Sequence, residues 1–418
     1  MFDRRTFLSS AGLAAAGLTA VGDIGCRPDE SAPLEPDSEL DDFIQNKMET
    51  DHIPGLAACT LNRDGILWAG EYGWADIERR IPMSLDSLQN VASISKTFTT
   101  TALLQLWEKD LFELDDDVSD YLPFPIRNPG HPQSPITFRH LLTHVSSIRD
   151  GSAYSAGYAC GDPQMALRTW MREYLKPGEM QYDSEQNFFE WAPGQRWSYC
   201  NIAYGLLAFL AEEISGTPFA QLCRNHIFEP LAMNQTSWYL ADIDLSQHVV
   251  PYTWLSAGEA RGPSWGGTPL GVIHQPGSPP SLDDGYKANC LYNHPNFPDG
   301  FLRTSVRQLS RYVRSYLLGG ALSGGASSKN RIPEEGTVEQ LFREHTDLSD
   351  SRIQGLTWYT AFRVREDAAW GHGGSDPGVN TDMQLLRSEG IAAIVFTNTN
   401  GVRPGEVTQH LLDRTTPV

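Results

Sequence analysis

Lysine is scarce in this chain: six lysines stand among 418 residues, and arginine supplies the rest of the 32 basic side chains. Only Lys96 has a serine three residues before it. Acidic residues number 52, so the formal net charge is −20. That charge opposes binding to the phosphate backbone of nucleic acids and to anionic membrane surfaces. The composition therefore predicts no nucleic-acid partner.

Cysteine is sparse as well, and no two cysteines are spaced as Cys-x-x-Cys, so no zinc or dithiol redox motif is present. The six are Cys26, Cys59, Cys160, Cys200, Cys223 and Cys290. Removal of a signal peptide with Cys26 would leave an odd number, so not all can pair within the chain. Buried free thiols are the favoured interpretation. His140 and His144, four residues apart, lack the glutamate of a His-Glu-x-x-His site, and we predict neither a metal nor a cofactor.

The apolar run over 7–21 is too short to span a bilayer. It follows the twin-arginine pattern Asp3-Arg4-Arg5-Thr6-Phe7-Leu8 and ends at small residues. This predicts an export signal over 1–26, and hence a periplasmic or extracellular protein. A membrane anchor would require lipidation of Cys26, and Asp23 stands where a lipobox has an aliphatic residue. A linker rich in Pro, Asp and Glu follows over 27–39.

Hydrophobic patterning places strands near both ends of the remaining chain. Two apolar runs separated by the turn Asn62-Arg63-Asp64-Gly65 predict a β-hairpin over 54–75. Further strands are predicted over 355–365, 382–387 and 390–398; helices over 40–49, 91–110, 136–144, 201–215, 305–318 and 405–413; and a long loop over 252–286. We predict a mixed α/β domain over 40–413, with its sheet from 40–114 and 296–413 and a helical insertion over 115–295.

Ser93 and Lys96 begin the predicted helix over 91–110. Residues three apart lie on one face of a helix. A serine hydroxyl is a weak nucleophile until a base takes its proton, and lysine is such a base when burial lowers its pKa. The helix N-terminus also favours negative charge that develops near Ser93. Ser-x-x-Lys alone is a weak signal, and the alternative is a helix cap followed by a solvated lysine.

Tyr199-Cys200-Asn201 precedes a second predicted helix. A buried Tyr199 near an ammonium group could sit as a phenolate or relay a proton. Asn201 has both donor and acceptor atoms and could hold Lys96 or a substrate amide. The alternative roles are a packing tyrosine and a helix-capping asparagine.

His372-Gly373-Gly374-Ser375 lies between two strand-like runs. Glycines let the backbone approach a ligand closely. The backbone N–H of Ser375, together with that of Ser93, could form an oxyanion hole. His372 could bind a substrate carboxylate or polarise the Ser–Lys–Tyr network. The alternative is a glycine-rich hairpin with an incidental histidine.

Together, Ser93-Ile-Ser-Lys96, Tyr199-Cys-Asn201 and His372-Gly-Gly374 resemble the three motifs of the penicillin-recognising serine hydrolases. This superfamily contains class C β-lactamases, D-alanyl-D-alanine carboxypeptidases and related esterases. The resemblance runs from about residue 40 to about residue 413, with supporting stretches at 136–144, 193–199, 230–233 and 301–305. It implies a β-lactamase-like fold, in which an antiparallel sheet with flanking helices adjoins an α-helical subdomain.

The resemblance also implies an exported serine hydrolase that forms an acyl-enzyme and cleaves a small-molecule ester, amide or peptide. The catalytic residues it implies are Ser93, Lys96 and Tyr199, and the substrate-binding residues are Asn201, His372, Gly373, Gly374 and Ser375. Class C β-lactamases typically carry lysine where His372 stands, which favours an esterase or a D-amino-acid peptidase. A β-lactamase, an acyltransferase and a non-catalytic binding relative stay open as alternatives. Trp254, Trp265 and Tyr286 either line the cleft or anchor the 252–295 loop.

Overall fold

The computed structural model describes residues 38–255, 264–265, 268–269, 272–274, 285–322, 331–347 and 352–416. The predicted export signal and nearly all of the predicted linker lie outside these residues. Within them, no helix combines the length and the apolar character needed to cross a membrane.

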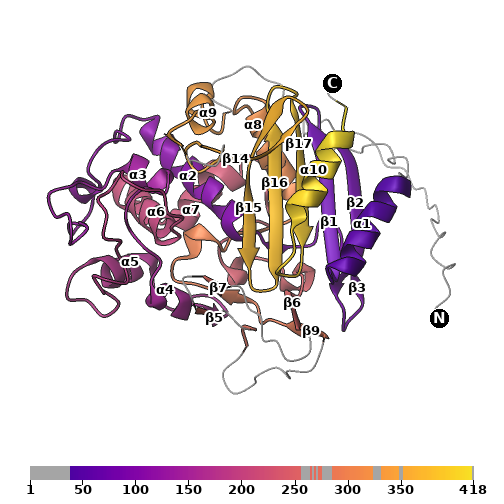
Figure 1. Cartoon of the computed structure of the whole chain (residues 1–418), viewed down its shortest axis with the longest axis horizontal. Coiled ribbons are helices and arrows are strands. Elements are labelled where there is room, and N and C mark those ends of the chain that lie inside the picture. Colours follow the sequence, from indigo (N-terminus) through magenta and orange to yellow (C-terminus); the bar gives the residue numbers. More distant parts are fainter. Residues whose placement is uncertain are drawn as a thin grey trace, which may run out of the picture. The chain divides into compact units, whose positions relative to one another are not determined.

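Strands from both ends of the chain share one large antiparallel sheet (Figure 1). Its order among the described residues is β12 (Thr346–Asp347), β13 (Ile353–Gln354), β14 (Tyr359–Val364), β15 (Asp367–Asp376), β16 (Val379–Leu386), β17 (Ile391–Thr397), β1 (Gly55–Asn62), β2 (Ile66–Asp76) and β3 (Ile81–Pro82). The predicted hairpin is β1–β2, and β1 pairs on its other side with β17. The mixed α/β fold with an antiparallel sheet is therefore confirmed, while the exact boundaries of the helical insertion stay a prediction.

Helices pack on both faces of the sheet and form a block beside it (Figure 1). They are α1 (Ser38–Thr50), α2 (Ser95–Trp107), α3 (Phe138–Leu142), α4 (Ser152–Ala156), α5 (Leu167–Leu175), α6 (Ile202–Ser215), α7 (Phe219–Cys223), α8 (Val306–Leu317), α9 (Glu335–Leu341) and α10 (Pro404–Arg414). Residues at helical spacing and caps explain most of these ends. For example, α6 stops at Gly216, which adopts a left-handed conformation with φ 67°.

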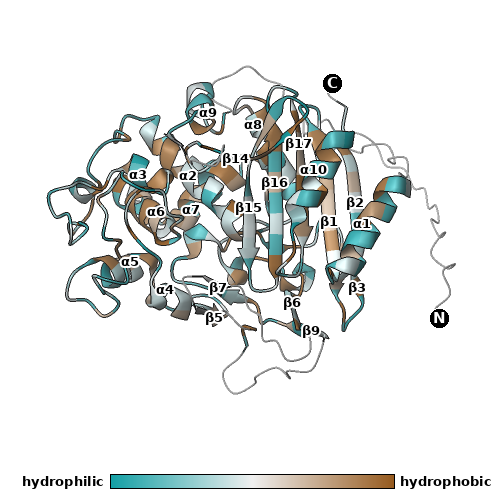
Figure 2. Ribbon diagram, in the orientation of Figure 1, coloured by the Kyte–Doolittle hydropathy of each residue, from teal (hydrophilic) through white to brown (hydrophobic). Residues whose placement is uncertain are grey.

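Alternation along β1 separates the two faces of the sheet, because successive side chains of a strand point in opposite directions. Leu56 and Ala58 belong to a small core that α1 and α10 cover. Ala57, Cys59 and Leu61 belong to the larger core, which includes α8, α2 and α6. All of β1 is buried, so its sequence reads as one apolar run. Figure 2 shows hydrophobic colour along β1, whereas α1 and α10 carry both colours.

Two segments differ from the predicted elements. The loop predicted over 252–286 contains strands at its ends, because β6 (Tyr252–Leu255) pairs with β9 (Gly285–Ala288). Inside it, β7 (Ser264–Trp265) pairs with β8 (Thr268–Pro269), and the rest is largely outside the described residues. The glycine-rich third motif is not a connection between strands: it lies within β15. Glycine is a poor strand former, so the sequence pattern did not predict β15. Pairing with β14 and β16 stabilises this strand.

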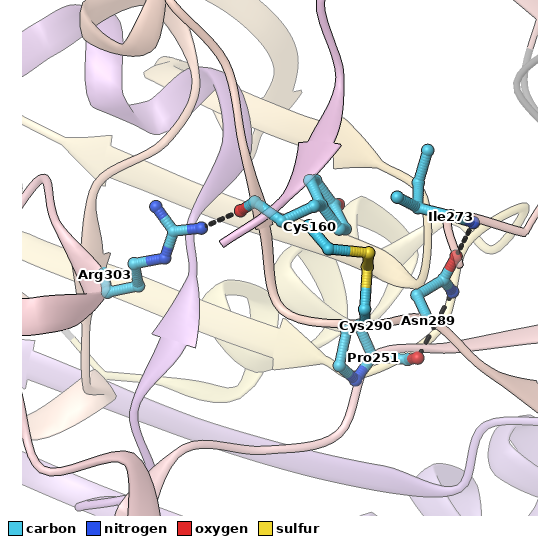
Figure 3. Close-up of a disulfide and its surroundings, with 7 residues drawn as sticks. Cys160, Pro251, Ile273, Asn289, Cys290 and Arg303 are labelled. Carbon is cyan, nitrogen blue, oxygen red and sulfur yellow. Dashed lines mark hydrogen bonds between the residues drawn. A yellow bond between two sulfur atoms is a disulfide. The ribbon is translucent and has the colours of Figure 1, made fainter. Parts of the chain in front are cut away.

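Two short pairings tie distant segments together near the helical block. In these, β4 (Gln89–Asn90) pairs with β11 (Arg303–Thr304), and β5 (Ala159–Cys160) pairs with β10 (Tyr292–Asn293). The second pairing places two cysteines side by side, and Cys160 and Cys290 form a disulfide (Figure 3). The prediction of buried free thiols was wrong for this pair; it holds for Cys59, Cys200 and Cys223. Spacing alone gave no sign of the bond, since 130 residues separate its ends.

Replacing both Cys160 and Cys290 by alanine is expected to lower the free energy of unfolding by about 3 kcal/mol, because the bond closes a long loop in the unfolded chain. Urea denaturation of the variant and the parent measures the difference. Dithiothreitol should lower the stability of the parent by a similar amount and leave the variant unchanged. Equal stability of the two proteins under oxidising conditions would contradict this expectation.

Candidate active site

Ser93 lies in a 3₁₀ turn, Ala92–Ile94, immediately before α2 rather than inside it. The Ala92 N–H donates to Asn90 Oδ1 at 3.0 Å, and Ala92 adopts a left-handed conformation with φ 47°. A non-glycine residue in that region is strained, and such strain gathers at functional sites. The turn presents the half-buried Ser93 to a cleft of about 330 Å³.

Lys96 is completely buried one turn into the same run. Its Nζ lies 3.0 Å from Ser93 Oγ, and it donates to Asn201 Oδ1 at 2.7 Å and to the Asp299 carbonyl oxygen at 2.7 Å. Burial lowers the pKa of this lysine, and the surrounding carboxylates oppose that shift. A neutral Lys96 has a free lone pair that can accept the Ser93 proton while its two N–H groups keep the other two contacts.

Tyr199 covers the Ser93–Lys96 pair. Lys96 Nζ is 4.9 Å from the centre of the Tyr199 ring, and that ring stacks on His144 at 4.4 Å. Burial raises the pKa of Tyr199 well above 10, and a hydrogen bond with Ser93 only partly opposes the shift. Of the two predicted states, this environment favours the neutral phenol, which can donate a proton, over the phenolate.

Asn201 directs its side chain to Lys96 and does not cap α6 with it. Asp150, which the sequence analysis missed, performs the capping instead. Its Oδ1 accepts from the backbone N–H groups of Asn201 and Ile202, both at 2.9 Å. Its Oδ2 accepts from the Asn201 backbone N–H and from Asn201 Nδ2, also at 2.9 Å. The carboxylate thus fixes the Asn201 amide with its oxygen toward Lys96.

Two further buried aspartates were missed. Asp299 Oδ2 is 3.8 Å from Lys96 Nζ and accepts from the Tyr154 hydroxyl at 2.7 Å. Asp376 accepts from the Tyr158 hydroxyl at 2.8 Å. Burial raises the pKa of Asp299 to about 6 and that of Asp376 to about 7. No motif spacing signals them; only the fold brings them to the lysine.

His372 is buried and neutral. Its Nδ1–H donates to the Gly373 carbonyl oxygen at 2.7 Å, and its Nε2 has no hydrogen-bond partner among the described residues. Burial, with the nearby Lys96 charge, lowers its pKa to about 3. A neutral imidazole does not provide the positive charge that a substrate carboxylate requires. Of the two predicted roles, this state is compatible with polarising the network through Nε2.

Gly374 lets β15 approach the Ser93 turn. A Cβ on Gly374 would lie 2.4 Å from the Val91 carbonyl oxygen and 3.0 Å from Ala92 Cβ. Any side chain there would push the strand away from the turn. The cleft between them is lined by Ser93, Trp197, Tyr199, Tyr359, His372, Gly373, Gly374, Ser375, Thr381, Asp382, Pro404 and Gly405. Of the predicted site residues, Lys96 and Asn201 lie behind this lining: Lys96 contacts Ser93 and Tyr199, and Asn201 contacts Lys96.

The other residues singled out in the sequence serve the framework. His140 Nδ1 accepts from the Thr137 N–H at 3.3 Å, and His144 Nδ1 accepts from the Cys200 N–H at 3.1 Å. Across the described parts of the chain, no three His, Cys, Asp or Glu side chains gather as a metal site. Trp254 stacks on His52 at 3.9 Å and packs edge-on against Tyr286, so both anchor β6 and β9. The Trp265 side chain is not among the side chains that the structure describes.

We expect Asp299→Asn to move the acidic limb of the pH–rate profile to lower pH. The Asp299 charge raises the pKa of Lys96, so its removal lowers that pKa, and the neutral base persists about one pH unit further into acid. The kcat/KM for an accepted ester, measured from pH 5 to 10, gives the limb. Asp376→Asn should shift it in the same direction by less, because the Asp376 charge contributes less. A shift to higher pH in Asp299→Asn would contradict this coupling.

Three comparisons with known proteins agree with this geometry. A family profile described as Beta-lactamase matches residues 40–415. Penicillin-binding protein 4* of Bacillus subtilis is 31% identical over 42% of this chain and 36% of its own length. The D-alanyl-D-alanine-carboxypeptidase/endopeptidase AmpH of Escherichia coli is 28% identical over 56% of this chain and 57% of its own length. Each match thus spans less than two thirds of the relative.

A solved structure shares the fold. The octameric penicillin-binding protein homologue from Pyrococcus abyssi superposes with a TM-score of 0.69 at 21% identity, over 90% of this chain and 76% of its own. The β-lactamase-like architecture implied by the three motifs is thereby confirmed.

Proposed function

Because the chain belongs to the Beta-lactamase family of penicillin-binding-like serine hydrolases, we propose that it is an exported hydrolase that forms an acyl-enzyme on Ser93 and cleaves a small ester or amide. The contact that carries the proposal is Lys96 Nζ at 3.0 Å from Ser93 Oγ, with the lysine fully buried. Burial is what makes lysine a base near neutral pH.

In the proposed mechanism, Ser93 Oγ attacks the substrate carbonyl carbon while neutral Lys96 takes the hydroxyl proton. The negative charge on the carbonyl oxygen is held by the N–H groups of Ser93 and Ser375. The Tyr199 phenol then donates its proton to the leaving oxygen or nitrogen, and Lys96 returns the proton to Tyr199. Water then attacks the acyl carbon while Lys96 takes one of its protons. That proton passes to Ser93 Oγ as the bond from Oγ to the acyl carbon breaks, so the products are the acid and free Ser93.

Within the hydrolases, an esterase or D-amino-acid peptidase is our first choice, and the AmpH similarity supports the peptidase. The neutral His372 weakens the case for a β-lactamase, because it adds no positive charge for the carboxylate of a penicillin. Export is supported by the twin-arginine pattern and by the Cys160–Cys290 disulfide, since such bonds persist in oxidising compartments.

Hydrolysis of three compounds separates the candidates: p-nitrophenyl butyrate, a peptide ending in D-alanyl-D-alanine, and benzylpenicillin. Hydrolysis of the ester, the peptide or both supports the proposal. Rapid turnover of benzylpenicillin in preference to both would make the protein a β-lactamase. If none reacts and a fluorophosphonate probe fails to label the protein, the non-catalytic alternative replaces the proposal.

A further inference from the structure

The charge of the cleft wall suggests what the proposed hydrolase accepts. Lys96 lies behind the lining, and His372 is neutral. Among the described residues that line the cleft, Asp382 is the one with an ionised side chain. Asp382 lies on β16 directly opposite Gly373 of β15. Its carboxylate is therefore next to the strand that carries the third motif.

Within the described parts of the chain, one oxygen of this carboxylate has no hydrogen-bond partner. Asp382 is 6% exposed, and its Oδ1 accepts from Gln384 Nε2 at 2.9 Å. Oδ2 is buried without a hydrogen bond. The Thr408 hydroxyl and the Met383 backbone N–H lie near enough to lower the pKa of Asp382, but the hydroxyl donates to the Pro404 carbonyl oxygen. A buried charge with an unsatisfied oxygen is costly, and a cation brought to it recovers part of that cost.

Two glycines of the cleft lining lie beside the carboxylate. A Cβ on Gly373 would lie 3.5 Å from Asp382 Oδ1 and 3.7 Å from the Tyr359 hydroxyl. A Cβ on Gly405, at the start of α10, would lie 3.6 Å from Asp382 Oδ2. A methyl group at either position would be in van der Waals contact with the carboxylate. Burial raises the pKa of Asp382 to about 6, so the group is still ionised at neutral pH.

We infer that Asp382 selects substrates bearing an ammonium group close to the scissile carbonyl, and that it disfavours those with a carboxylate there. This inference rests on the proposed function and specifies its substrate class. A charge in a wall of low dielectric acts strongly across a few ångströms, and like charges brought together there repel. An amino-acid amide or ester with a free amine fits such a cleft.

A neighbouring hollow of about 90 Å³ offers the opposite charge. It shares Trp197, Tyr199 and Tyr359 with the cleft and is lined further on by Arg352 and Gln354. Burial raises the pKa of the Tyr359 phenol, and the Arg352 charge opposes part of that shift, so the guanidinium lies near that hydroxyl. If the substrate extended past Tyr359, Arg352 would favour a carboxylate. A substrate that lies beside Asp382 should react faster with a cationic group than with an anionic one, and a substrate that reaches Arg352 should show the opposite order.

The test compares matched amides that differ only in charge: D-alanine p-nitroanilide, its N-acetyl form and its N-succinyl form. A second set places the charge on the other side of the scissile bond, with phenylacetyl thioesters of thiocholine, N-acetylcysteamine and thioglycolate. We expect kcat/KM in at least one set to favour the cation over the anion by about tenfold or more. Asp382→Asn should reduce that cation-to-anion ratio by about tenfold.

Glu406→Gln is the control, because Glu406 is a carboxylate of α10 that pairs with Lys47 and does not line the cleft. The cation-to-anion ratio of kcat/KM in Glu406→Gln should equal that of the parent. The cation-to-anion ratio is measured on the parent protein alone, so the inference can be tested even if Asp382→Asn folds poorly. Turnover with equal rates for all charges, or a preference for the anion, would overturn the inference and leave the proposed hydrolase intact. No turnover of any compound and no probe labelling would instead remove the proposed function itself.

Discussion

Ser93→Ala is expected to lower kcat/KM for any accepted substrate by a factor on the order of 10⁴ or more, while the protein stays folded. Ser93 Oγ is the atom that would form the acyl bond, and water cannot replace it at that position. The side chain is half-buried and bonds to no backbone group of the described residues, so its loss should change the free energy of unfolding by less than about 1 kcal/mol. Steady-state kinetics and urea denaturation measure the two effects.

Ser95→Ala is the matched control, two residues along the same run. Ser95 is completely buried, and its Oγ accepts from the Leu302 N–H at 3.0 Å. Its loss should cost about 1 kcal/mol of stability and leave kcat/KM within about threefold. Comparable activity of Ser93→Ala and the parent would remove Ser93 as the nucleophile.

Asp150→Asn is expected to cost about 2–4 kcal/mol of stability and to lower kcat by about 100-fold. The carboxylate accepts from two backbone N–H groups at the start of α6 and from Asn201 Nδ2. An amide in its place must turn its NH₂ group toward at least one of these donors. The Asn201 amide, no longer fixed, can rotate its oxygen away from Lys96.

Asp183→Asn separates this effect from ordinary capping. Asp183 Oδ1 also accepts from two backbone N–H groups, those of Glu185 and Gln186, but it is exposed and forms no contact with Lys96 or Asn201. Its replacement should cost less than about 1 kcal/mol and leave kcat unchanged. If Asp150→Asn loses stability but keeps full kcat, Asp150 serves the fold alone.

Local spacing predicted the parts of the site that lie close in sequence. Ser93 and Lys96 meet because three residues make nearly one turn, and Asn201 reaches Lys96 from the start of a helix that the apolar pattern had marked. The resemblance supplied Tyr199 and the third motif. By contrast, the Lys96–Asp299 contact joins residues 203 positions apart, and the nearby stretch 301–305 supported the resemblance without indicating a role for Asp299.

The sequence also did not predict the charge state of His372 or the pairing of the cysteines. Whether His372 is cationic depends on burial and on the nearby Lys96, which only the packed structure defines. The cysteine count required at least one unpaired thiol but could not select Cys160 and Cys290, which meet through the β5–β10 pairing. The strand β15 was concealed because its glycines, which let it approach the Ser93 turn, are poor strand formers.

The most direct test of the account is to trap the acyl group. The protein is mixed with p-nitrophenyl acetate or benzylpenicillin and quenched in acid within seconds. Intact-mass spectrometry followed by peptide mapping then locates any adduct. We predict one acyl group per chain, on the peptide that contains Ser93, and none in Ser93→Ala. Hydrolysis without an adduct on Ser93, or an adduct on another residue that turns over at the catalytic rate, would contradict the account.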